Sequence, residues 1–68
     1  MVNTERDAAH AAASWLRALA MSRQSGGWHL RGRPRHIQHI WKVHWRTQDR
    51  AAAVAVDART AGLCYAFT

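Results

Sequence analysis

Features that would identify an enzyme or a secreted protein are scarce in this sequence. Its 68 residues include one cysteine, one proline and only four carboxylate side chains. Cys64 has no partner for a disulfide within the chain, so it either stays reduced or pairs with a second copy, and we expect the reducing cytoplasm as the location of the protein. The N-terminal segment carries Glu5 and Asp7 and no long apolar run, so we expect neither a secretory signal nor a membrane-spanning segment.

Residues that could carry catalysis or bind a metal are also few. The carboxylates fall at the expected ends of helices and strands, where such residues act as caps and turn formers: Glu5, Asp7, Asp49 and Asp57. On an extended strand His36 and His39 point to opposite faces, and His36 and His44 stand about 26 Å apart, which disfavours a shared zinc site. We therefore expect a protein that is not an enzyme and that holds neither a metal nor a cofactor.

Large apolar side chains are few, apart from tryptophan. Alanine supplies 14 of the hydrophobic residues, whereas Leu, Ile, Val and Phe together number only 11. A buried aromatic side chain removes about 150–250 Å² from water, so the tryptophans can supply much of a small core. We expect Trp15, Trp41 and Trp45 in the core, and Trp28, which follows two glycines, to be partly exposed. A domain of this size is marginally stable, which favours self-association.

Positive charge dominates the sequence and is unevenly distributed. Ten basic side chains against four acidic ones give a net charge of +6, and no Asp or Glu occurs from residue 8 to residue 48. All five histidines lie in the same region and would add positive charge in mildly acidic solution. A surface built from this region favours an acidic partner, either nucleic acid or an acidic protein surface. The alternative is a compositional bias that enriches alanine and arginine without any ligand.

The residues before the paired glycines predict one amphipathic helix, over about residues 4–24. Asn3 or Thr4 can cap its N-terminus, with Thr4 and Asp7 forming a variant of the capping box. Paired glycines commonly follow a helix C-terminus. Apolar residues recur with helical spacing at Ala8, Ala12, Trp15, Leu16 and Leu19.

After the glycines the hydrophobic period changes from that of a helix to that of a strand. We expect strands over about residues 37–46, 52–57 and 63–67, with a possible short strand over 28–31. Residues 49–58 could instead form a helix, since alanine is a strong helix former, but the alternation of Val54 and Val56 favours a strand.

Together these elements predict an α+β fold in a single domain over residues 1–68. One N-terminal amphipathic helix would pack on a three- to four-stranded antiparallel meander, because the helix offers the only other apolar surface. The last strand is apolar and ends the chain, and an exposed apolar edge invites pairing with another chain. We therefore expect a homodimer formed through an edge strand.

A short arginine-rich segment stands between the helix and the long strand. Its core, Arg31-Gly32-Arg33-Pro34, resembles the AT-hook, a family of short elements that bind the minor groove of AT-rich DNA. The resemblance implies that Arg31 and Arg33 enter the groove while Gly32 and Pro34 shape the backbone path. Guanidinium groups are attracted to a narrow minor groove, which suits that role. The alternative is a connecting loop whose arginines are simply solvated.

The basic residues of this region form a larger candidate binding surface. If the side of the strand with Trp41, Val43 and Trp45 faces the helix, the residues between them face outward beside the arginine-rich loop. Such a strip can follow phosphates, and an exposed tryptophan could stack on an unpaired base. The candidate binding residues are Arg31, Arg33, Arg35, Lys42, His44, Arg46 and Trp28.

Two classes of function follow from this surface. In the first, the chain is a small basic binding protein that engages nucleic acid through the arginine-rich loop and strand face, in an accessory or regulatory role. In the second, it is an inhibitor of the kind that phages or other mobile elements encode, docking on a host protein complex that handles nucleic acid, as anti-CRISPR proteins do.

Overall fold

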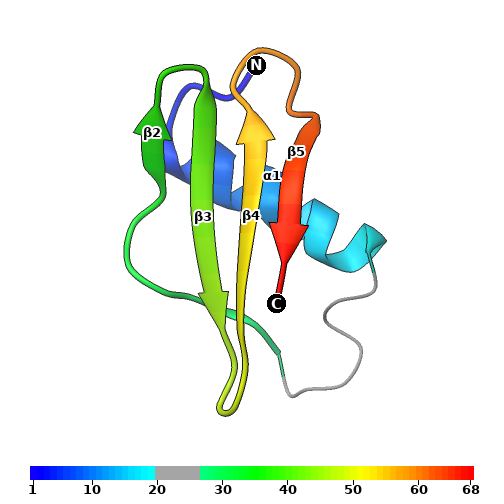
Figure 1. Ribbon diagram of the computed structural model, residues 1–68. Helices are drawn as coiled ribbons and strands as arrows, with labels where there is room; N and C mark the ends of the chain where they lie inside the picture. Colours follow the sequence, from blue (N-terminus) through cyan, green and yellow to red (C-terminus); the bar gives the residue numbers. More distant parts are fainter. Residues whose placement is uncertain (20–26) are drawn as a thin grey trace.

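One helix lies across one face of an antiparallel sheet in the computed structural model of the chain, which describes residues 1–19 and 27–68 (Figure 1). The elements are α1 (Glu5–Ala18), β1 (His29–Leu30), β2 (Arg35–Ile37), β3 (Ile40–Arg46), β4 (Ala51–Asp57) and β5 (Leu63–Phe67). The order across the sheet is β1-β3-β4-β5, and β2 pairs with β3 on the same side as β1. The predicted α+β fold, with one N-terminal helix on an antiparallel sheet, is confirmed.

Of the two predicted caps, Thr4 and not Asn3 caps the N-terminus of α1. The Thr4 hydroxyl accepts a hydrogen bond from the backbone N–H of Asp7 at 3.1 Å, and the acidic side chains of the first turn suit the positive end of the helix dipole. The described helix ends at Ala18, and residues 20–24 of the predicted helix lie outside the described residues. No helix within the described residues has the length and hydropathy needed to cross a membrane.

The strand predicted over residues 37–46 is divided by a tight reversal. β2 and β3 are joined by a hairpin whose two loop residues are Gln38 and His39, and Ile37 pairs with Ile40. Gln38 has φ 56°, a conformation that glycine or asparagine usually supplies in such loops. The sequence therefore carries no ordinary hairpin signal here, and its alternation is continuous enough to predict a single strand.

Residues 51–57 form a strand rather than the alternative helix. β4 pairs along its full length with β3, so that Val54 lies opposite Val43 and Val56 lies opposite Trp41. These cross-strand neighbours are buried on the helix side of the sheet. Packing against β3 thus outweighs the helix propensity of the alanines.

The core lies between α1 and the central strands. Small side chains at Ala8 and Ala12, together with Leu16, face the sheet from the helix. The sheet contributes alternate residues of its two central strands: Trp41, Val43 and Trp45 from β3, and Ala52, Val54 and Val56 from β4. The alanines bring little volume, so the tryptophans and valines of the sheet supply most of the buried surface.

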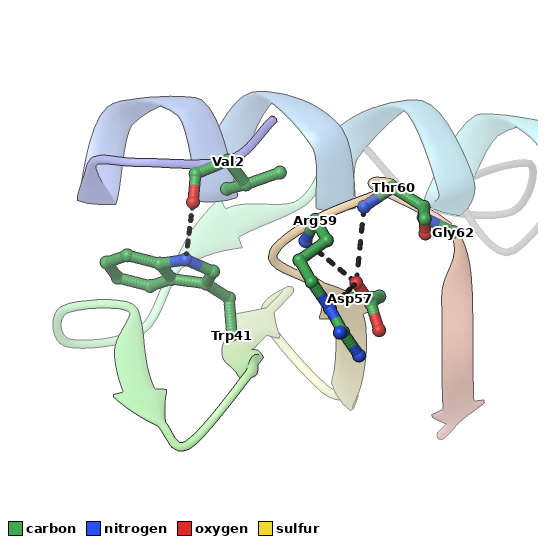
Figure 2. A network of polar contacts seen from close by, with 6 residues as sticks. All are labelled: Val2, Trp41, Asp57, Arg59, Thr60 and Gly62. Atoms are coloured by element: carbon green, nitrogen blue, oxygen red, sulfur yellow. Dashed lines mark hydrogen bonds and ion pairs between the residues drawn. The ribbon is translucent and has the colours of Figure 1, made fainter.

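The N-terminal segment is fixed to the sheet by hydrogen bonds on both sides of Val2. The Val2 N–H donates to the carbonyl oxygen of Ala58 at 2.7 Å, and the Val2 carbonyl oxygen accepts from the indole Nε1 of Trp41 at 3.0 Å (Figure 2). Val2 is itself buried. The Trp41 side chain therefore packs in the core and also secures the segment before α1.

The two tryptophans of β3 are predicted to respond differently to replacement by phenylalanine. Trp41→Phe leaves the Val2 carbonyl without its donor, whereas the Trp45 indole N–H is buried and has no hydrogen-bond partner among the described residues. An unsatisfied buried group costs about 1–3 kcal/mol, so Trp41→Phe should lower the free energy of unfolding by about 1–2 kcal/mol more than Trp45→Phe. Denaturant unfolding of both variants measures the difference, and equal losses would contradict the assigned role of Trp41.

Candidate functional site

The helix covers only one face of the sheet and leaves the other exposed. Figure 1 is seen from the uncovered side, with α1 behind the strands. Side chains alternate along a strand, so residues that lie between the core residues point to this uncovered side, here called the open face. The strand residues of the open face are His29, Arg35, Ile37, Ile40, Lys42, His44, Arg46, Ala51, Ala53, Ala55, Asp57, Tyr65 and Phe67.

Cross-strand pairing arranges these residues in rows that run across the sheet. One row is formed by Arg35, Lys42, Ala55 and Tyr65, each directly opposite the next. The neighbouring row consists of His44, Ala53 and Phe67, and a third contains His29, Arg46 and Ala51. The open face therefore has basic side chains over β2 and β3, alanines along β4 and aromatic rings on β5.

The basic side of the open face is not neutralised within the described chain. Arg35 and Lys42 lie directly opposite each other, an arrangement of like charges that destabilises a sheet. The ion pairs among the described residues join Arg33 to Glu5 and Arg59 to Asp57, and neither includes Arg35, Lys42 or Arg46. This concentration of positive charge would be relieved by an anionic ligand.

Asp57 is the one acidic residue among the described strand residues of the open face, and it is engaged in the β4–β5 turn. Its Oδ1 accepts hydrogen bonds from the backbone N–H groups of Arg59 at 2.7 Å and Thr60 at 3.2 Å (Figure 2). The hydrogen bond from the Arg59 backbone is the main reason that the pKa of Asp57 lies below its ordinary value. Its carboxylate organises the turn at one end of the sheet.

The alanines of β4 form a low strip between the basic and aromatic residues. Ala55 is 0% exposed and Ala53 is 6% exposed, although both point away from the helix and neither belongs to the core beneath it. A strip of small side chains, here called the alanine strip (Ala53 and Ala55), therefore separates the basic side chains of the open face from its aromatic rings.

The aromatic side of the open face could not be assembled from the sequence, because a β-bulge changes the face to which the β5 side chains point. Val56 lies opposite Leu63 on the helix side, whereas Ala55 lies opposite Tyr65, so Cys64 is an extra residue between the two pairs. Simple alternation places Leu63 and Tyr65 on one face. The bulge instead sends Leu63 toward the core and Tyr65 to the open face, and no residue of β5 signals it.

Tyr65 and Phe67 form a pair on the open face. Their ring centroids are 5.9 Å apart with an angle of 19° between the ring planes. Tyr65 is 39% exposed and Phe67 is 60% exposed, so both present aromatic surface to solvent. The sequence did not predict that these two rings share a face of the sheet with the basic residues.

The arginines of the AT-hook-like segment are directed to separate places. The backbone N–H of Arg31 donates to the His44 carbonyl oxygen at 2.9 Å, which holds the start of the loop against β3. Arg33 donates to both carboxylate oxygens of Glu5, at 2.9 Å and 2.7 Å, and this interaction raises its pKa above the ordinary value. Arg35 lies on the open face. The structure therefore brings Arg35 together with Lys42 and separates both from Arg33.

A polar hollow of about 360 Å³ lies beside the β3–β4 turn. Its charged lining residues are three arginines and one aspartate, so it continues the basic side of the open face toward the end of the sheet: Arg31, Arg46, Arg50 and Asp49. Trp28 lies nearby, half-buried against the core, with the Arg50 guanidinium 5.7 Å from its ring centroid. Trp28 is thus an internal packing residue as well as a partner of Arg50.

The histidines do not assemble into a metal site in the described part of the chain. His36 stacks on the Trp41 ring, with the two ring centroids 4.5 Å apart. No group of three or more His, Cys, Asp or Glu side chains among residues 1–19 and 27–68 is arranged to hold a metal ion.

Comparison of the chain with protein-family models, curated proteins and solved structures gives no match.

The stability of the β4–β5 turn should depend on pH through the carboxylate of Asp57. Because folding lowers this pKa, the ionised carboxylate stabilises the folded state at neutral pH, and the contribution disappears as the pH falls and the group is protonated. We expect Asp57→Asn to lower the Tm at pH 7 and the difference from the parent chain to shrink toward pH 3. Thermal unfolding across this range measures it, and a difference independent of pH would contradict the role given to the charge.

Proposed function

We propose that the chain is a small, non-enzymatic protein that binds nucleic acid through phosphate contacts on the basic side of its open face, in an accessory or regulatory role. The observation that carries this proposal is the row arrangement, which places Arg35, Lys42, His44 and Arg46 on one continuous surface with no ion pair among the described residues to any of them. Arg31 extends that surface at the β3–β4 turn.

The charge distribution supports a polyanion as the partner. Adjacent cations repel one another in the free protein, and successive phosphates neutralise several of them at once. Arg33 is a weaker candidate than the sequence suggested, because its guanidinium is already paired with Glu5. That pair is 83% exposed on the arginine side, so it can rearrange with little loss of stability.

Salt dependence and a charge-matched pair of variants test this proposal. A fluorescent oligonucleotide is titrated with the protein at several salt concentrations, and binding is followed by anisotropy. Arg35→Ala combined with Arg46→Ala should weaken binding about tenfold or more and reduce the slope of log affinity against log salt by roughly 0.7–0.9 for each phosphate that the variant no longer neutralises. Arg6→Ala combined with Arg17→Ala removes the same charge from the exposed side of α1 and is the control.

The results separate this function from docking on a protein. Equal weakening in the two double variants would show that only net charge matters, and the assignment of the open face would be wrong. Absence of binding to both single-stranded and duplex oligonucleotides at about 50 mM salt would exclude direct nucleic-acid binding, since phosphate contacts are strongest at low salt. An acidic protein surface would then be the remaining partner class for the basic residues.

Self-association through β5 belongs to the same proposal. β5 has a strand neighbour on one side only among the described residues, so its other side is free to pair with β5 of a second copy. We expect a homodimer in which two sheets join edge to edge and their open faces become continuous. Sedimentation velocity should show the average mass rising from about one chain to about two as the concentration increases, and a monomer at high micromolar concentration would contradict it.

The cellular setting is proposed from the cysteine. Cys64 is exposed and free, and an exposed thiol remains reduced most readily in the cytoplasm. A cytoplasmic location also gives access to nucleic acid.

A further inference from the structure

The aromatic side of the open face indicates the form of nucleic acid that it binds. We propose that Tyr65 and Phe67 stack on unpaired bases, so that the ligand of the open face is single-stranded nucleic acid. This inference rests on the proposed function, because it assigns the base-binding half of the surface whose other half binds phosphates.

The exposure of the two rings has no explanation in the fold itself. Both point away from α1, and neither contributes to the core. The rings already lie next to each other without a ligand, with 5.9 Å between their centroids. A base can therefore extend an existing aromatic stack, with little loss of side-chain freedom on binding.

The rows of side chains across the sheet match the two sides of a single nucleic-acid strand, one of which carries the phosphates and the other the bases. Neighbouring β-strands lie about 4.8 Å apart, so the backbone of Tyr65 is roughly 10 Å from that of Lys42, with Ala55 between them. Phe67 and His44 are related in the same way across Ala53. A single nucleic-acid strand lying over the alanine strip would direct its phosphates toward β3 and its bases toward β5.

A duplex cannot use this surface in the same way. Its bases are stacked inside the helix, so it offers phosphates to the basic side but no ring face to Tyr65 or Phe67. An unpaired strand offers both. The geometry therefore predicts that the aromatic pair gives the protein a preference for single-stranded nucleic acid. The basic side gives it affinity for single strands and duplexes alike.

Replacing the rings while keeping apolar side chains tests the inference. Anisotropy titrations use a 20-nucleotide oligothymidine and a 20-base-pair duplex at the same salt concentration. Tyr65→Leu combined with Phe67→Leu should weaken binding to the single strand about fivefold or more and leave duplex binding nearly unchanged, because base stacking is removed. Tyr65→Phe keeps the ring and should retain binding to the single strand. Circular dichroism and thermal unfolding confirm that the variants are folded.

A cross-linking experiment locates the binding position directly. A single strand carrying a photoreactive halogenated pyrimidine is irradiated with the parent protein, and the products are digested with trypsin. Cleavage after Arg59 places both rings in one peptide, residues 60–68, which contains no further Lys or Arg. We expect the adduct on this peptide, and its disappearance in the double leucine variant.

The outcomes distinguish failure of this inference from failure of the proposed function on which it rests. Equal affinity for both oligonucleotides, unchanged in the double leucine variant, would overturn base stacking and leave phosphate binding intact. Full retention of single-strand binding by the double leucine variant would show that binding does not need the two rings, and would also overturn the inference. Absence of binding to either oligonucleotide removes the proposed function and this inference together.

Discussion

The structure depends on the fact that one helix can cover only one face of a sheet. Ala8, Ala12 and Leu16 of α1 bury the inner sides of β3 and β4, and this packing is the only core that the described residues form. Without a second layer, the other face must be stable in water or be covered by a ligand. Everything that distinguishes the open face follows from that one-sided core.

β4 meets this requirement with small residues. On its inner side Val54 and Val56 are fully buried, and on its outer side Ala55 is equally buried and Ala53 nearly so, although both point away from the helix. A larger apolar residue at either alanine would add exposed hydrophobic surface to the open face. The alanine-rich composition, which by itself is ambiguous between bias and function, thus has a defined structural role at these positions.

Much of the fold could be predicted from the sequence, because local signals and burial agree over most of it. Residue type narrows the cap of α1 to Asn3 or Thr4, and the hydrophobic period gives the inward side of β3. The same alternation placed Lys42, His44 and Arg46 opposite the core, where the structure has them.

The rest depended on single-residue irregularities that leave no mark in the sequence. The hairpin at Gln38–His39 and the bulge at Cys64 each shift the side-chain alternation by one position, and a shift of one exchanges the faces of all residues beyond it. Because of the bulge, Tyr65 and Phe67 could not be assigned to the same surface as Lys42. The ion pair of Arg33 with Glu5 joins residues far apart in the chain, so it too was inaccessible to local reasoning.

β3 serves two purposes at once, since Trp41, Val43 and Trp45 hold the core while Lys42, His44 and Arg46 occupy its other side. A molecule that binds the surface residues of β3 also restrains its core residues, because both groups belong to one seven-residue strand. Occupancy of the surface and integrity of the chain are therefore thermodynamically linked, and a bound partner shifts the folding equilibrium toward the native state. In a domain this small, such a partner would act as a missing structural layer.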